Sequence, residues 1–259
     1  MRPQLAPLLE RRAQAGLFLD FDGTLSEIVA VAADARPVEG ARELLERAAQ
    51  KLAVVAVVSA RSAGQLVEWL GPDVEIWGVH GAQRAISGSI VLSEAVRPFE
   101  AAMAEVRDEA AAAFRDRGLK GAEVEDKGVV ITLHYRTARD PGAAGAAVAE
   151  IARDLAGRHD VTVSPGRMSI ELGPPVELSK AAVVRDRARE AGLAAAMFVG
   201  DDTGDLPAFD ALDDLAREGV ATVRVAVRSD ESPPELLERA DVVVDGTAGV
   251  VRLLSELLR

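Results

Sequence analysis

The fold is decided by the stretch Leu17-Phe18-Leu19-Asp20-Phe21-Asp22-Gly23-Thr24-Leu25. Its first three residues are apolar without alternation, which is typical of a parallel strand covered on both faces. The carboxylates that follow cannot be buried among hydrocarbon without partners. We therefore expect Asp20 and Asp22 at the carboxyl end of the strand, where open α/β sheets bind ligands. Gly23 lets the backbone turn there and lets a ligand approach closely.

This pair of carboxylates suits phosphoryl transfer. One carboxylate is able to attack an electrophile, the second is able to carry a proton, and a cation fits between them. The alternative is an ordinary turn that closes the strand, because Asp and Gly are common turn residues.

The composition indicates a folded, acidic protein. Of the 259 residues, 49% are hydrophobic and the charged residues are well mixed, as in globular proteins. The formal net charge of -12 argues against a nucleic-acid or anionic-membrane partner, so an anionic substrate needs a local cation or metal. Cysteine is absent, the apolar runs are too short for a membrane span, and Met1–Gly16 lacks the apolar region of a signal peptide. We therefore expect a cytoplasmic protein.

The two outer parts of the chain alternate predicted strands and helices, which favours a parallel sheet. In the first part we expect strands at 17–20, 52–58 and 74–79, helices at 37–51 and 62–70, and a hairpin at 83–92. In the last part we expect strands at 195–199, 221–227 and 242–244, and helices at 178–192, 205–218 and 250–258.

The middle of the chain follows a different order. It predicts a helix at 98–118, strands at 122–125 and 129–135, a helix at 141–157, and strands at 160–164 and 168–172 around a Pro165-Gly166 turn. This αββαββ order predicts an antiparallel sheet with helices on one face. We expect an α/β core formed by residues 1–96 and 174–259, and an inserted domain at 97–173.

Further polar residues are expected at strand ends and helix starts. Ser59 is able to donate to a phosphate oxygen, and Lys180 to place a charge beside it. Asp201 suits Mg²⁺, which takes one or two carboxylates besides water and phosphate, with Asp202 or Asp205 in the next shell. Each feature also has an ordinary explanation: a helix cap, a solvated lysine, or an acidic helix N-terminus.

In this order and spacing, the motifs resemble those of the haloacid dehalogenase (HAD) superfamily of phosphohydrolases, and the insert lies where a C2-type cap lies. A closer resemblance is to the trehalose-6-phosphate phosphatase family. The motifs that carry it are Asp20 to Leu25, Ser59-Ala60-Arg61, Val79-His80-Gly81-Ala82, Glu125-Asp126-Lys127, His134-Tyr135-Arg136, and Gly200-Asp201-Asp202 through Phe209. The resemblance implies a Rossmann-like HAD core with a parallel sheet and an inserted α+β cap.

The resemblance also implies a Mg²⁺-dependent phosphatase of trehalose biosynthesis that hydrolyses trehalose 6-phosphate. Asp20 would attack phosphorus to give an aspartyl-phosphate, while Asp22 would protonate the departing sugar oxygen and then activate water. Mg²⁺ would be held by the Asp20 carboxylate, the Asp22 backbone carbonyl and Asp201. Ser59 and Lys180 would hold the phosphate oxygens.

Sugar recognition would fall to the cap, which on closing would also exclude water. Charged residues next to cap strands suit a surface that hydrogen-bonds sugar hydroxyls, although outward-facing strand residues are the ordinary explanation. From the core, Arg61, His80 and Gly81 would reach the same substrate. The cap residues with this implied role are Glu125, Lys127, His134, Arg136 and Glu171.

Four residues in three motifs depart from the usual family pattern. Gly204-Asp205-Leu206 stands where Thr-Asp-Glu is usual, Ala181 where a glycine is, and Gln83 where an acid is. These departures bear on the sugar contacts, and none of them falls on the implied nucleophile, acid/base or metal ligand. The alternatives are a phosphatase for sucrose phosphate or glucosylglycerate phosphate, a receiver-like signalling domain, and a non-catalytic binding domain of a trehalose-synthesising complex. We expect a phosphorylated disaccharide as the substrate, no nucleic acid or membrane partner, and a monomer or weak oligomer.

Overall fold

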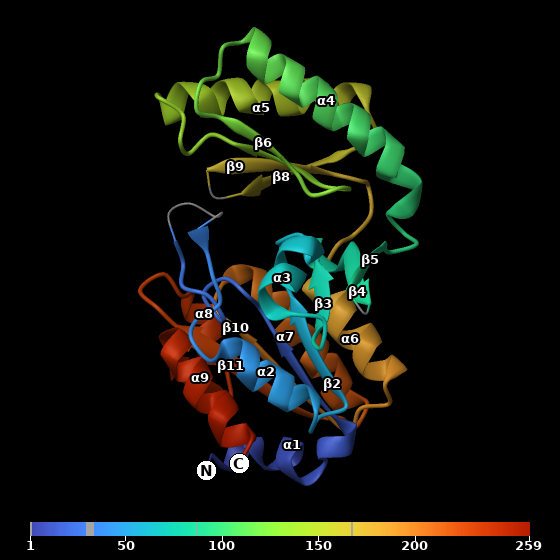
Figure 1. Ribbon diagram of the computed structural model, residues 1–259, viewed down its shortest axis with the longest axis vertical. Coiled ribbons are helices and arrows are strands. Elements are labelled where there is room, and N and C mark those ends of the chain that lie inside the picture. The colour runs from blue at the N-terminus through green and yellow to red at the C-terminus, as the bar shows by residue number, and fades with distance from the viewer. Residues whose placement is uncertain (1, 30–33, 87, 167) are drawn as a thin grey trace. The chain divides into compact units, whose positions relative to one another are not determined.

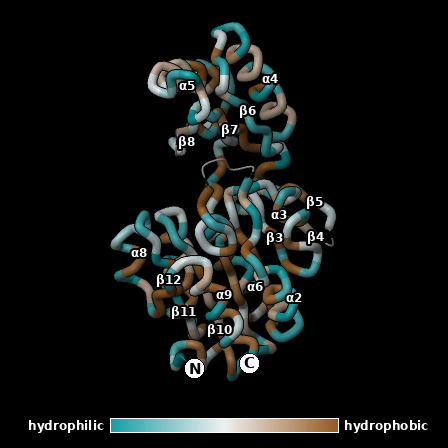
Figure 2. Tube along the Cα trace, turned by 60° about the vertical axis from the view of Figure 1, so that its left-hand side comes forward, coloured by the Kyte–Doolittle hydropathy of each residue, from teal (hydrophilic) through white to brown (hydrophobic). Residues whose placement is uncertain are grey.

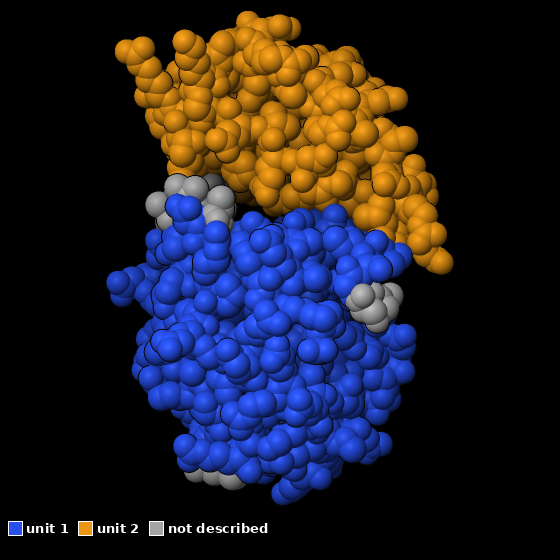
Figure 3. Space-filling view, in the orientation of Figure 1, with its two compact units in different colours: residues 1–91, 178–259 blue, residues 92–177 orange. Residues whose placement is uncertain are grey.

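The computed structural model describes residues 2–29, 34–86, 88–166 and 168–259, and it divides into two compact units (Figures 1 and 3). The first unit combines Met1–Val91 with Leu178–Arg259, and the second is Leu92–Glu177. The assignment of these units as a catalytic core and a specificity cap stays a prediction.

The first unit is built on an eight-stranded sheet. The five successive pairings from the edge strand β12 to β3 are parallel, and β3 pairs antiparallel with β4. In spatial order the strands are β12 (Val242–Asp245), β11 (Ala221–Arg228), β10 (Ala195–Gly200), β1 (Ala15–Leu19), β2 (Val54–Val58), β3 (Glu75–Gly78), β4 (Gln83–Ile86) and β5 (Ser89–Leu92).

Helices cover both faces of this sheet. Alternate residues of the central strands accordingly belong to different hydrophobic clusters. Leu17 and Leu19 face one cluster, whereas Phe18 faces the other. The first cluster includes residues of α1 (Ala6–Glu10), α2 (Ala41–Ala49), α3 (Ala63–Leu70) and α9 (Gly246–Leu257); the second includes residues of α6 (Lys180–Glu190), α7 (Leu206–Arg217) and α8 (Pro234–Arg239). The prediction of an α/β fold with a parallel sheet is confirmed.

The second unit has the αββαββ order that the sequence predicts. Its antiparallel sheet has the strand order β6-β7-β9-β8, and its elements are α4 (Glu100–Asp116), β6 (Glu123–Asp126), β7 (Ile131–His134), α5 (Pro141–Arg158), β8 (Thr162–Gly166) and β9 (Ser169–Gly173). Apolar side chains of β7 and β9 pack with those of α4 and α5 in one core. Figure 2 colours the chain trace by hydropathy, and the trace of this unit includes brown, hydrophobic stretches. The opposite face of the sheet carries polar residues.

Several predicted boundaries are wrong. The helix expected from Pro37 begins at Ala41, because Gly40 adopts a left-handed conformation (φ +79°) and Pro37 instead bridges to Ser26. The expected Pro165-Gly166 turn is part of β8. The last helix starts at Gly246 rather than at residue 250. The short helices α1 and α8 were not expected from the sequence.

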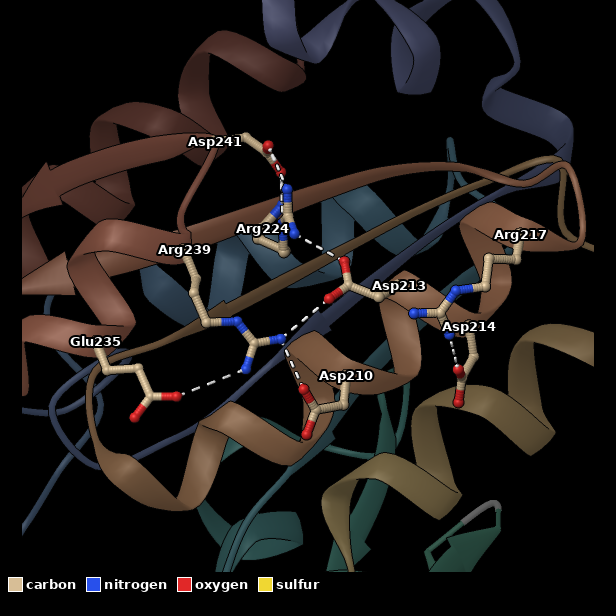
Figure 4. A network of polar contacts seen from close by, with 8 residues as sticks. All are labelled: Asp210, Asp213, Asp214, Arg217, Arg224, Glu235, Arg239 and Asp241. Atoms are coloured by element: carbon tan, nitrogen blue, oxygen red, sulfur yellow. Dashed lines mark hydrogen bonds and ion pairs between the residues drawn. The ribbon is translucent and has the colours of Figure 1, made fainter.

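One ion-pair network ties α7, α8 and the outer strands together (Figure 4). The Arg224 guanidinium donates to Asp241 (2.8 Å) and to Asp213 (2.7 Å). Arg239 of α8 donates to Asp213 as well (3.0 Å) and to Asp210 (2.6 Å). Among the described residues, no helix has the length and apolar composition needed to cross a membrane.

Candidate active site

The site begins where two neighbouring strands end together. β1 and β10 are parallel and adjacent, with Leu19 in register with Val199, so the residues that follow each strand emerge at the same edge of the sheet. Asp20 continues the ladder by donating its backbone N–H to the Val199 carbonyl (2.9 Å). Carboxylate oxygens of Asp20, Asp201 and Asp205 consequently lie within 4.8 Å of one another.

Lys180, the first residue of α6, lies between two of these carboxylates. Its Nζ is 2.7 Å from Asp20 Oδ1 and 2.8 Å from Asp205 Oδ1, and all three residues are buried. Burial lowers the pKa of Lys180, but the Asp20 and Asp205 carboxylates raise it more, so the net shift is upward and the amine stays charged. The sequence-predicted Asp20 and Lys180 are thus in direct contact.

The buried cluster has too little positive charge. Three carboxylates face one ammonium group. Burial raises the pKa of Asp20 well above its ordinary value, against the attraction of Lys180, and the charges of Asp205 and Asp201 raise it further. Burial, with the charges of Asp205 and Asp202, raises the pKa of Asp201 to about 8. With all three carboxylates ionised, the cluster has two excess negative charges, which a divalent cation would balance.

Asp201 has the features of a cation ligand. Its Oδ1 is buried and has no hydrogen-bond partner among the described residues. Its Oδ2 lies so close to Gly23 that a Cβ there would be 2.0 Å away, and Gly23 also has φ +77°. Only glycine allows the Asp201 carboxylate to approach the loop after β1 in this way. The residues present fit a hard cation with oxygen ligands.

Asp205 plays a supporting part. Its Oδ1 accepts from Lys180, and its Oδ2 accepts from the backbone N–H groups of Asp201 (2.8 Å) and Asp202 (3.2 Å). Asp205 and Asp202 also form a capping box at the turn that precedes α7. Asp205 therefore holds Lys180 and the loop that carries Asp201 in place.

Asp22 lies against Arg61 rather than in the buried cluster. Arg61 donates from Nε to Asp22 Oδ2 (2.7 Å) and from Nη2 to Asp22 Oδ1 (2.8 Å). The guanidinium lies over the rings of Phe21 and Trp69, with its Cζ 5.6 and 5.2 Å from their centroids. Ser59 is buried at the end of β2, and its Oγ accepts the Arg61 backbone N–H (3.2 Å). Arg61 thus connects two of the predicted site residues.

His80 and Gly81 lie in the turn that follows β3. Val79, His80 and Gly81 all have positive φ, an arrangement that is strained for the first two residues. The His80 backbone N–H donates to the Ser59 carbonyl (2.9 Å), which ties the turn to the end of β2. A Cβ on Gly81 would lie 2.5 Å from a Val183 methyl group, so this glycine has a packing role.

The positions that depart from the family pattern have structural roles. Gln83 is buried, and its Oε1 accepts the backbone N–H of Ala63 at the start of α3 (2.8 Å). Leu206 packs against the second hydrophobic cluster of the first unit. A Cβ on Gly204 would be 3.1 Å from Asp202 Oδ1, beside the capping box. None of the three lies among the buried carboxylates.

The second unit brings most of its predicted residues together on the polar face of its sheet. Lys127 Nζ is 3.0 Å from Glu171 Oε1 and 3.8 Å from Glu125 Oε2. His134 Nε2 is 2.8 Å from the same Glu125 oxygen. Arg136 lies beyond the end of β7 in an exposed position. This face therefore alternates anionic and cationic groups.

The sequence reasoning missed two contributors. Thr132 lies on this polar face, buried, and donates to Glu171 Oε1 (3.2 Å). The alternation of apolar and polar residues in 131–134 was the signal that could have found it. Trp69 stacks on Phe21 (centroids 5.3 Å apart) and under Arg61, and the sequence contains no local signal for that contact.

Known proteins resemble this chain in sequence. It is 32% identical over 231 residues to a trehalose-phosphate phosphatase of Mycobacterium leprae, covering 84% of this chain and 52% of the relative. It is 37% identical over 210 residues to one of Mycolicibacterium paratuberculosis, covering 76% and 51%. The chain thus spans about half the length of these curated relatives.

Solved structures resemble it in fold. A trehalose-6-phosphate phosphatase related protein superposes with a TM-score of 0.75 at 23% identity, covering 94% of this chain and 96% of the other. A haloacid dehalogenase-like hydrolase from Bacteroides thetaiotaomicron gives a TM-score of 0.62 at 15% identity, covering 94% and 99%. These likenesses confirm the HAD-like fold. The family pattern described as Trehalose-phosphatase matches residues 18–240, and the chain belongs to the trehalose-phosphatase family.

Proposed function

We propose that this chain is a Mg²⁺-dependent phosphatase that hydrolyses trehalose 6-phosphate to trehalose and phosphate through an aspartyl-phosphate intermediate. The observation that carries the proposal is the convergence of Asp20, Lys180 and Asp201 at one edge of the sheet. The family and the named activity of the curated relatives support the substrate. A cytoplasmic location stays a prediction.

In the first chemical step, an Asp20 carboxylate oxygen attacks phosphorus and the bond to the sugar oxygen breaks, which leaves an acyl phosphate on Asp20. Asp22 gives its proton to the departing sugar oxygen. In the second step Asp22 takes a proton from water, whose oxygen attacks phosphorus and releases phosphate from Asp20. Lys180 and Ser59 hold phosphate oxygens through both steps.

The contact between Asp22 and Arg61 matters for the second of these chemical steps. Arg61 donates to both carboxylate oxygens of Asp22, and such a two-point contact fixes the orientation of the group. Arg61 then holds this base in place for the second step.

Asp20 and Asp201 would supply carboxylate oxygens to Mg²⁺, with the Asp22 backbone carbonyl as a third ligand. Asp201 Oδ1 is buried and has no hydrogen-bond partner in the described part of the chain, which supports this assignment. When bound, the ion neutralises negative charge that develops on the phosphoryl oxygens. Asp205 and Asp202 would hold the loop that carries Asp201.

The polar face of the second sheet would bind the sugar. Glu125 and Glu171 accept hydrogen bonds from hydroxyl groups. Lys127 is held beside Glu171 by an ion pair, and His134 is held beside Glu125 by a hydrogen bond. Arg136, His80, Gly81 and Arg61 are proposed as additional substrate contacts on the family resemblance alone.

The test is phosphate release from a panel of monoesters with and without EDTA. The panel contains trehalose 6-phosphate, glucose 6-phosphate, sucrose phosphate, glucosylglycerate phosphate and an aryl phosphate. We expect the highest kcat/KM with trehalose 6-phosphate and loss of all turnover with EDTA, restored by Mg²⁺. A preference for another sugar phosphate would refute the substrate, and no release from any ester would refute the enzyme.

A further inference from the structure

The polar face of the second sheet contains a buried hydroxyl group, that of Thr132, which takes no part in the proposed phosphoryl transfer. Thr132 lies on β7, the strand between β6 and β9, directly opposite Glu125 on one side and Glu171 on the other. The three side chains therefore form one row on one face of the sheet. Thr132 is only 2% exposed, so its hydroxyl is fixed by its surroundings rather than by solvent.

Two donors converge on a single oxygen of Glu171. The Thr132 hydroxyl donates to Oε1 at 3.2 Å, and Lys127 Nζ donates to the same atom at 3.0 Å. Both contacts orient the plane of the Glu171 carboxylate. A sugar hydroxyl that meets this group needs a donor–acceptor distance of about 2.5–3.0 Å, so the orientation of the carboxylate decides which hydroxyl positions it accepts.

The two donors differ in how firmly they hold Glu171. Lys127 has a long, flexible side chain whose ammonium also lies 3.8 Å from Glu125, so it is able to shift between the two carboxylates. Threonine is branched at Cβ and has a stiff χ1 angle, which fixes the direction of its hydroxyl. Thr132 is therefore the donor that keeps Glu171 in one orientation when Lys127 moves.

We propose that Thr132 is a positioning residue for sugar specificity, which acts by fixing the Glu171 carboxylate. This inference rests on the proposed function, because it assumes that Glu171 meets the sugar. Thr132 itself takes no part in phosphoryl transfer. It should therefore affect the KM for a sugar phosphate and leave the chemical step unchanged.

The experiment compares Thr132→Val, which removes only the hydroxyl, with Thr132→Ser, which keeps it. Thr162→Val is the matched control, since the Thr162 hydroxyl donates to the Gly173 carbonyl (3.2 Å) in the same sheet and, among the described residues, forms no hydrogen bond with Glu171. The values of kcat and KM are measured with trehalose 6-phosphate and with an aryl phosphate, which has no sugar to recognise.

We expect Thr132→Val to raise the KM for trehalose 6-phosphate about tenfold, the loss typical of one hydrogen bond to a charged group, with kcat within about twofold. The aryl phosphate should be hydrolysed as by the wild type. Thr132→Ser should restore the KM, and Thr162→Val should leave it unchanged. In a Glu171→Ala background, Thr132→Val should raise KM no further, because the carboxylate it positions is gone.

An unchanged KM in Thr132→Val, an equal loss with the aryl phosphate, or an additive effect in the Glu171→Ala background would overturn the inference. An additive effect would mean that Thr132 acts independently of Glu171, for example by stabilising the sheet. If the wild type prefers another sugar phosphate, the proposed substrate fails, and the same variants tested on the preferred ester still decide the role of Thr132.

Discussion

The two units each carry a cluster of charged side chains, and the clusters differ in their charge balance. In the first unit, Asp20, Asp201 and Asp205 are buried around one lysine, with negative charge in excess. In the second, Glu125 and Glu171 are half-exposed and are accompanied by Lys127 and His134. The comparison teaches that buried carboxylates in excess over one lysine suit a cation and a phosphate, whereas accessible carboxylates beside a lysine and an imidazole suit a neutral sugar.

The largest expected effect comes from the centre of the first cluster. Asp20→Asn keeps the size of the side chain but removes the nucleophile, so turnover of every phosphate ester should fall by at least about 10³-fold. Circular dichroism and thermal melting should show an intact fold. An active Asp20→Asn enzyme would refute the assignment of the nucleophile.

The second cluster should affect only substrates that carry a sugar. Glu171→Ala removes a carboxylate from the polar face, and we expect kcat/KM for trehalose 6-phosphate to fall about 10²-fold. The value for an aryl phosphate should stay within about twofold of the wild type. Equal losses with both esters would remove the second unit from the specificity argument.

Cation binding should depend on pH in the first cluster. Without a cation the raised pKa of Asp201, about 8, means that the folded state binds its proton more tightly than the unfolded state does, so stability falls as pH rises toward 8. A cation needs the ionised carboxylate, and it should raise the melting temperature by about 5 °C at pH 8.5 and by less at pH 6. The measurement is thermal melting with Mg²⁺ and with EDTA; an equal shift at both pH values would contradict this.

The smallest effect is expected from charges of the second unit that lie away from the polar face. Arg117, which follows α4, and Glu150 of α5 form an exposed ion pair, with Arg117 Nη1 2.7 Å from Glu150 Oε2. Arg117→Ala should change the free energy of unfolding by no more than about 0.5 kcal/mol and leave both substrates unaffected. A loss of sugar turnover in this variant would show that recognition is not confined to the polar face.

The sequence predicted the first cluster better than the second. A carboxylate that directly follows a buried apolar strand is expected at the carboxyl end of the sheet. Asp20 and Asp201 each follow such a strand, so their position at the same edge was predictable. The charged residues of the second unit were identified through the family resemblance. Their pairing with Thr132 depends on strand register, which the sequence does not specify.

Other features depend on tertiary contacts that leave no local signal. Gly40 makes the expected helix begin later, at Ala41, by adopting a left-handed conformation, which a glycine permits but does not require. The stacking of Arg61 on Trp69 joins side chains whose contact no periodicity indicates. Gln83 stands where the family usually has an acid, and only the structure reveals that it binds the backbone at the start of α3.

The most direct test of the account is calorimetric titration of Mg²⁺ into the wild type and into Asp201→Asn. The account predicts one bound ion in the wild type and no measurable binding in the variant, whose carboxamide is neutral and a poorer ligand. Equal affinity in the two proteins would contradict the claim that Asp20 and Asp201 share a cation.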